Sequence, residues 1–224
     1  MTARLQVKAL VAHAARHALG IALLLAGGHH APTALLGALA LHLAAFAFTH
    51  DLAHGALGLP RRLNELALSL AALPMFVAGH GMRLLHLRHH ARPLAQDDVE
   101  GVGATMPFWR AFLAGPMNTA HYRIEAFRVA SRKERHWLLA ETLASVLLAT
   151  LALLTHSIAG AAWVVVNVAM QLTASVWASN LTHRPPAFLL TIAQWLTWTR
   201  SAVIGSFLHH ERHHRFPAIP CGQL

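Results

Sequence analysis

Residues 17–50 read HALGIALLLAGGHHAPTALLGALALHLAAFAFTH, and this stretch contains no Asp, Glu, Lys or Arg. A helix needs roughly 20 apolar residues to cross the hydrocarbon core of a bilayer, so the stretch is too long for a single crossing. Gly27, Gly28 and Pro32 interrupt it near the middle, where these residue types favour a turn. The stretch therefore predicts two antiparallel membrane helices joined by a tight turn.

A second pair of apolar stretches has the same organisation. Residues 137–154 and 161–179 are uncharged except for Glu141, and the sequence THSIAG separates them. The composition agrees, because 55% of the 224 residues are hydrophobic and only 12% are charged. We therefore expect an all-α integral membrane protein with four transmembrane helices in two hairpins, in a single domain over residues 1–224. The other segments are expected to form a histidine-rich cytosolic cap with interfacial helices.

The distribution of charge predicts the orientation in the membrane. The formal net charge is +9, but Lys and Arg fall almost wholly outside the two hairpins, and neither turn contains one. This is the positive-inside pattern, which places both termini and residues 51–136 in the cytosol. We favour it over the hypothesis that a basic chain binds nucleic acid. Arg16 is the exception, because it requires a side chain that reaches the interface or a first helix that is only partly inserted. No cleavable signal peptide is expected.

Histidine is abundant, with 19 residues, and eight of them form three clusters. The clusters lie in HDLAH, HLRHH and HHERHH, and their histidines are His50, His54, His86, His89, His90, His210, His213 and His214, with His209 as an extra histidine at the start of the third. Helix positions i, i+3 and i+4 share one face, so each cluster points its imidazoles at one place. Eight imidazoles exceed the ligands of one metal ion and suit two. Neutral nitrogen ligands suit Fe, Zn, Cu or Ni better than Mg, Ca or Mn.

The three clusters can share a site only if they lie on one side of the membrane. Too few residues separate His54 from His86 for two crossings, so residues 63–80 are expected to lie along the interface. Two crossings between the second and third clusters return the chain to the cytosol. Residues 187–208 are therefore expected to form a tilted or interfacial helix rather than a span, although they are long enough to cross.

Other ionisable residues near the clusters receive weaker assignments. Asp51 and Glu211 lie inside clusters, where they either accept hydrogen bonds that orient the rings or are solvated surface charges. His13 and His17 form an isolated i, i+4 pair, to which we assign a structural or interfacial role.

The motifs HDLAHG, HLRHH and HHERHHRFPAIP resemble the three histidine boxes of the membrane fatty acid desaturase and hydroxylase superfamily, over roughly residues 20–220. This resemblance implies four membrane helices and a cytosolic cap that hold two non-haem irons, with dioxygen as co-substrate. WASNLTH is similar to the family pattern W-x2-N-x3-H, with one residue fewer between Asn and His. It implies His183 as a ninth ligand and Asn180 as a water-mediated one. Asp97 and Asp98, in an acidic segment after the second box, are assigned no role.

The resemblance favours an enzyme that introduces a double bond into a fatty acyl chain. A carotenoid ketolase or a lipid hydroxylase with the same site is the alternative, and no catalytic residue is expected beyond the metal ligands. The single cysteine, Cys221, excludes an internal Cys-ligated electron-transfer site, so a separate donor such as a ferredoxin is expected. A basic cytosolic face suits such an acidic donor. Its residues are Arg61, Arg62, Arg128, Arg132, Lys133 and Arg135. We expect a protein of the bacterial inner membrane with its site on the cytosolic side.

Two hypotheses from other classes stay open. A histidine-rich metal transporter would place its ligands near the bilayer midplane, whereas these clusters are expected at one face. A haem-binding cytochrome would need paired histidines on facing membrane helices, for which only His13, His17 and His42 are candidates.

Overall fold

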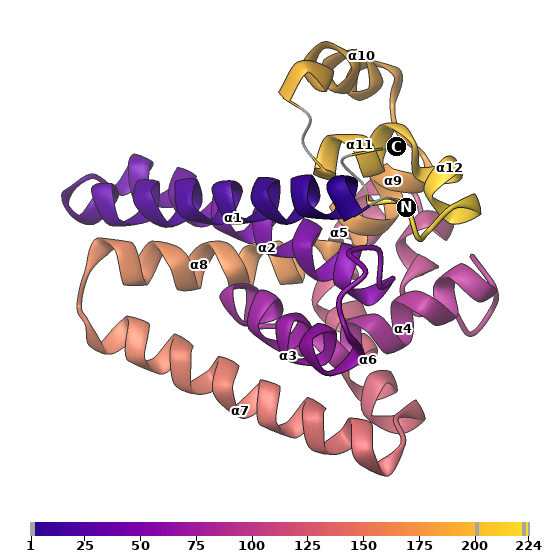
Figure 1. Cartoon of the computed structure of the whole chain (residues 1–224), viewed down its shortest axis with the longest axis horizontal. Coiled ribbons are helices and arrows are strands. Elements are labelled where there is room, and N and C mark those ends of the chain that lie inside the picture. Colours follow the sequence, from indigo (N-terminus) through magenta and orange to yellow (C-terminus); the bar gives the residue numbers. More distant parts are fainter. Residues whose placement is uncertain (1–2, 200–201, 221–222, 224) are drawn as a thin grey trace.

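The computed structural model describes residues 3–199, 202–220 and 223, and all regular structure in these residues is helical. The axes of four helices lie roughly along the length of the molecule (Figure 1). They are α1 (Ala3–Ala26), α2 (Ala31–Ala53), α7 (Arg132–Leu154) and α8 (Ile158–Leu172). A short 3-10 helix, η1 (Gly27–His29), joins α1 to α2. The predicted all-α class and the first predicted hairpin are therefore confirmed.

Small residues let α1 and α2 approach closely. A Cβ atom at Gly27 would lie 2.2 Å from the backbone nitrogen of Ala34, and one at Gly37 would lie 2.2 Å from that of Leu24. Such close backbone packing is how membrane helices associate where lipid is as apolar as the side chains. The first hairpin is thus closely packed at its glycines and alanines, with Leu24 and Leu41 buried beside them.

Three helices, α1, α2 and α7, are long and apolar enough to cross a membrane. The fourth predicted crossing is α8, which continues through a 50° bend into the π-helix η4 (Ser175–Asn180) and α9 (Leu181–His183). The apolar stretch predicted over residues 161–179 is therefore a helix with a bend rather than a straight one. Near the break, Thr173 Oγ1 donates to the Ala169 carbonyl at 2.8 Å, and such side-chain bonds to the preceding turn bend helices.

Residues 61–91 form a bent helix pair rather than a segment that lies along the interface. In this pair α3 (Arg61–Ala72) and η2 (Leu73–Met75) are followed by α4 (Gly79–Ala91), with a change of direction of 101°. The apex packs against α8, because Trp163 Nε1 donates to the Pro74 carbonyl at 2.8 Å and Gln171 Nε2 donates to the Met75 carbonyl at 2.8 Å. The prediction for residues 63–80 is corrected accordingly. The chain enters the bundle with α3 and leaves it with α4. The first two histidine clusters therefore lie at the same end of the bundle.

A buried polar network connects α3, α4 and α7. The carboxylate of Glu141 accepts from His80 Nδ1 at 2.6 Å and from Ser69 Oγ at 2.5 Å. On the other side of the ring, His80 Nε2 donates to Glu65 at 2.7 Å, and Arg83 binds the same carboxylate through both terminal nitrogens at 3.0 Å. This network explains how α7 tolerates Glu141, which is only 3% exposed.

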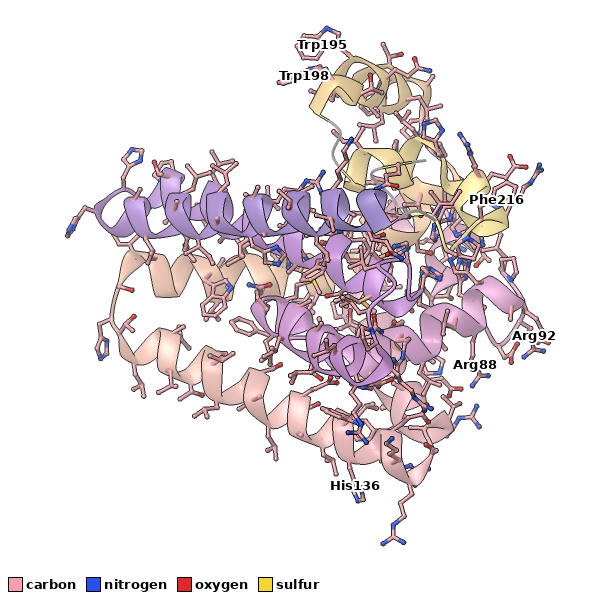
Figure 2. All side chains as sticks on the ribbon, viewed as in Figure 1. Arg88, Arg92, His136, Trp195, Trp198 and Phe216 are labelled. Carbon is pink, nitrogen blue, oxygen red and sulfur yellow. The ribbon has the colours of Figure 1, made fainter. Side chains whose placement is uncertain are left out.

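The other helices lie around the end of the bundle where α1 begins and α12 ends (Figure 1). They are η3 (Gly101–Thr105), α5 (Phe108–Leu113), α6 (Gly115–Val129), α10 (Ala187–Trp195), η5 (Leu196–Thr199), α11 (Ala202–Leu208) and α12 (His210–Arg215). Among the described residues of 187–208, α10 and α11 are too short to cross a membrane, and the expectation that this segment is tilted or interfacial stays a prediction. Trp195 and Trp198 point outward from this part of the chain (Figure 2) and are 75% and 74% exposed.

Candidate metal centre

Nine histidines gather at one end of the bundle, where α2, α4, α9 and α12 meet (Figure 1). They form two groups, and within each group one ring nitrogen of every histidine lies within 4.8 Å of the others. The five-histidine group consists of His50, His54, His86, His90 and His213. The four-histidine group consists of His89, His183, His210 and His214. The structure thus brings together all the histidines predicted from the three boxes, and His183 with them.

Adjacent histidines are divided between the two groups. His89 and His90 on α4 belong to different groups, and so do His213 and His214 on α12. Consecutive residues of an α-helix point roughly 100° apart, so a pair of neighbours can face two sites at once. The second and third boxes therefore each serve both groups, which places the two groups side by side.

Within each group, the ring nitrogens that point inward face one another. In the five-histidine group, His54 Nε2 lies 2.9 Å from His86 Nε2, and His213 Nε2 lies 3.1 Å from His90 Nε2. In the four-histidine group, His210 Nε2 lies 3.1 Å from the Nε2 atoms of His183 and His214. Imidazole nitrogens that converge on one point are the donor set of a metal site. The residues present therefore fit a bound metal in each group.

Carboxylates contact the outward nitrogens of three of these rings. His86 Nδ1 donates to Glu100 at 2.5 Å, and His89 Nδ1 donates to Asp98 at 2.7 Å. His50 Nδ1 lies 3.7 Å from Asp51 Oδ1. A hydrogen bond at Nδ1 fixes the tautomer in which Nε2 is unprotonated and available to a metal. Glu100 and Asp98 thus orient the rings of His86 and His89 without being part of either group, while Asp51 at 3.7 Å is an electrostatic neighbour of His50 rather than a hydrogen-bond partner.

Asp98 and Glu100 were not predicted from the sequence, and the assignment of no role to Asp98 is corrected. The loop after α4 folds around Asp98, whose carboxylate accepts from the backbone N–H groups of Leu94, Glu100 and Gly101 at 2.8, 3.1 and 3.0 Å. The acidic run QDDVEG close behind the second box was the available signal. Spacing alone could not show which of its acids points inward.

The imidazoles of α12 are held neutral. Burial and the neighbouring imidazoles lower the pKa of His210 and of His213 to about 2 and that of His214 to about 4. Burial also raises the pKa of Glu100 to about 6. For Asp98 burial is the largest single cause and acts in the same direction, but the hydrogen bond and charge of His89, together with the backbone N–H groups of Gly101 and Leu94, outweigh it and lower the pKa to about 2. Neutral imidazoles beside carboxylates can bind a cation without first losing a proton.

Two other predicted residues lie outside the groups. Glu211 is on the outward face of α12, where its 83% exposed side chain pairs with Arg215 at 2.5 Å. It is therefore a surface charge, and the alternative that it orients a ring is wrong. Asn180 is buried, and its Nδ2 donates to the carbonyls of Gly103 and Met106 at 2.9 and 2.7 Å. These bonds anchor η3 to η4, while a water-mediated role for Asn180 at the metal stays a prediction.

The chain is thus a helical bundle with candidate membrane spans and two adjacent histidine groups at one end that could each hold a metal ion. A family model described as fatty acid desaturase matches residues 11–224, which include all three boxes. The chain belongs to the fatty acid desaturase family, and a lipid substrate follows from that membership. The resemblance expected from the histidine boxes is thus confirmed. No curated protein and no solved structure matches the chain.

Proposed function

We propose that this protein is an oxygen-dependent lipid oxidoreductase that introduces a double bond into a fatty acyl chain, with one iron in each histidine group. The observation that supports it is the division of nine histidines into two adjacent groups in a chain of the desaturase family. When bound, two irons supply, with dioxygen, the oxidant needed to remove hydrogen from an unactivated methylene, which no side chain can provide.

The residues of the chain have three tasks in this proposal. The nine histidines hold the metals, and Asn180 contributes through a water molecule. Asp98 and Glu100 fix the rings of His89 and His86, because each accepts the Nδ1 proton and leaves Nε2 directed inward. Each group also contains a deeply buried ring, since His213 and His89 are only 1% and 2% exposed.

The reaction needs electrons from outside the chain. Conversion of –CH2–CH2– to –CH=CH– removes two protons and two electrons from the substrate, and the reduction of dioxygen to two water molecules takes two more electrons and two more protons. We propose that a separate acidic, ferredoxin-like protein delivers these electrons. Arg61, Arg62, Arg132 and Lys133 are exposed and suit such a donor. Arg128 and Arg135 are less suited, because Arg128 pairs with Glu125 at 2.6 Å and Arg135 donates to the Phe127 carbonyl at 3.0 Å.

The proposed location is the bacterial inner membrane, with the metal centre on the cytosolic side. The centre lies at the end of the bundle where α1 begins, opposite the two turns that contain no Lys or Arg. A transporter would instead carry ligands along a path near the middle of the bilayer.

The test is an assay of membranes that contain the protein, supplied with oxygen, a reductant and a ferredoxin. Mass spectrometry should show acyl chains that have lost two hydrogens, and turnover should fall as salt screens the docking of the donor. Membranes with the His213→Ala variant serve as the control. A gain of one oxygen would indicate hydroxylation, and a carotenoid that gains one oxygen and loses two hydrogens would indicate ketolation. Metal transfer across vesicles without lipid oxidation would contradict the enzyme.

A further inference from the structure

Helix α1 contributes none of the nine clustered histidines, yet it places a buried histidine against the first box. His13 Nε2 lies 3.0 Å from Asp51 Oδ2, and both side chains are only 2% exposed. These residues are 38 positions apart in the sequence and meet because α1 and α2 are antiparallel. A buried carboxylate is costly unless donors or positive charge compensate it, so this contact has an energetic reason to form.

Asp51 lies between His13 and the metal centre. While Oδ2 faces His13, Oδ1 lies 3.7 Å from Nδ1 of His50, which belongs to the five-histidine group. His13 and Asp51 together form an arrangement that ends on a proposed metal ligand.

The ring of His13 is itself held in place. It stacks on Phe48 of α2, with the ring centroids 4.8 Å apart and an angle of 24° between the planes. One turn further along α1, His17 Nδ1 donates to the backbone carbonyl of His13 at 2.8 Å, a bond that does not involve the His13 ring. A ring with a fixed plane directs its N–H consistently, which is what a residue that positions another group requires.

We propose that His13 is a positioning residue for the metal centre, a role that rests on the proposed function. By donating from Nε2 to one oxygen of Asp51, His13 holds the carboxylate so that its other oxygen is directed at Nδ1 of His50. That fixes the His50 ring with Nε2 toward the five-histidine group. His13 touches no metal and no substrate in this role, because it acts only through Asp51.

The test compares variants of His13 in the full-length protein loaded with iron. His13→Phe keeps an aromatic ring for the stack on Phe48 but removes the donor. His13→Gln keeps an N–H donor, and His13→Met has a similar length without one. His17→Ala is the control in the same helix. The measurements are iron per chain, the rate of iron loss to a chelator, and the Mössbauer spectrum, which separates the signals of the two iron sites.

We expect His13→Phe and His13→Met to lose one of the two irons about tenfold faster than the wild type. Only the signal of the iron in the five-histidine group should change, while His13→Gln and His17→Ala should retain both irons. If the Phe variant does not fold, the Gln and Met pair decides the question. Unchanged iron retention and an unchanged Mössbauer spectrum in His13→Met would overturn this inference and leave the proposed function standing. A wild-type protein that binds no iron would contradict the proposed function itself.

Discussion

His213 on α12 and His90 on α4 face each other with their Nε2 atoms 3.1 Å apart, although 123 residues separate them in the sequence. The next histidine along α12, His214, stacks on the same His90 ring with the centroids 4.1 Å apart. The helices α12 and α4 therefore contact each other through their histidine side chains. Both histidine groups form only when α12, near the C-terminus, packs on α4. The metal centre therefore depends on a segment far in sequence from the first two histidine boxes.

The first prediction is that neighbouring histidines of α12 control different metals. His213→Ala should empty the five-histidine group, and His214→Ala should empty the four-histidine group, because the two rings belong to different groups. Each variant should hold about one iron where the wild type holds two, and should lose desaturation. Iron analysis together with Mössbauer spectroscopy would identify which iron remains.

His209→Ala is the matched control, since this exposed histidine precedes α12 and belongs to neither group. His29→Ala is a second control, because His29 lies in the exposed turn after α1. Both should keep two irons and nearly full turnover. Loss of the same iron in His213→Ala and His214→Ala would contradict the division into two groups.

The second prediction concerns the carboxylate that orients His89. Asp98→Asn keeps the shape of the side chain but removes the charge beside His89 Nδ1 and weakens the acceptor of the 2.7 Å hydrogen bond. Loss of a carboxylate that supports a metal-bound histidine typically reduces metal affinity by 10- to 100-fold. We expect a loss in this range at the four-histidine group, measured by competition with a chelator of known affinity.

Asp97→Asn is the control from the adjacent position. Asp97 is about half exposed and pairs with Arg88 and Arg92 at 3.4 and 2.7 Å, so its charge acts at the surface (Figure 2 labels both arginines). Its replacement should leave iron affinity within about twofold, as exposed ion pairs contribute little. Equal losses in the two variants would show that the loop as a whole, rather than the contact with His89, supports the metal.

The histidine groups were largely predictable because helical geometry acts locally. The i, i+4 spacing of His86 and His90 places these two rings on one face, and they share a group. The expectation that each whole cluster points at one place is wrong, because His89, at i+3 from His86, belongs to the other group. The stretch without charge from His17 to His50 likewise predicts a membrane hairpin from composition alone. Such features need only a few neighbouring residues, so a single sequence is enough to identify them.

Contacts that depend on the path of the chain were not predictable. The sequence places Asp98 and Glu100 in a loop, and only the fold around Asp98 turns them toward His89 and His86. The re-entry of α3 was missed for a related reason, because residues 63–80 are apolar enough for an interface or for the interior of a bundle. Its position is decided by the partners of Pro74 and Met75 on α8, which lie far away in the sequence.

The third prediction concerns Glu141, whose buried carboxylate joins α7 to α3 and α4. Glu141→Leu would leave Ser69 Oγ and both the backbone N–H and Nδ1 of His80 without this acceptor, which they contact at 2.5, 3.1 and 2.6 Å. Removal of one partner from a buried ionic network costs about 3 to 5 kcal/mol. We expect a large fall in the melting temperature of the purified protein in detergent.

Two further variants make this prediction specific. Glu141→Gln preserves an acceptor oxygen and should lower the melting temperature less than Glu141→Leu. Glu211→Gln removes a carboxylate of the exposed pair with Arg215, for which the expected cost is below about 1 kcal/mol. If Glu141→Leu melts no lower than Glu211→Gln, the network does not stabilise the packing of α7.

The last prediction concerns the side of the membrane on which each end of the bundle lies. In a chain whose Cys221 is replaced by Ser, single cysteines at Gly28 and at Ile158 should react with a membrane-impermeant thiol reagent added outside. Gly28 suits the experiment because a side chain there meets no atom within 4 Å, and Ile158 is 40% exposed at the start of α8. A cysteine at the exposed Gln96, in the loop that follows α4, should react only after the membrane is opened. This pattern is expected because the turns contain no Lys or Arg, while the histidine groups lie at the opposite end of the bundle. Labelling of the Gln96 position from outside, or protection of the two turns, would reverse the proposed orientation and place the metal centre away from the cytosolic electron donor.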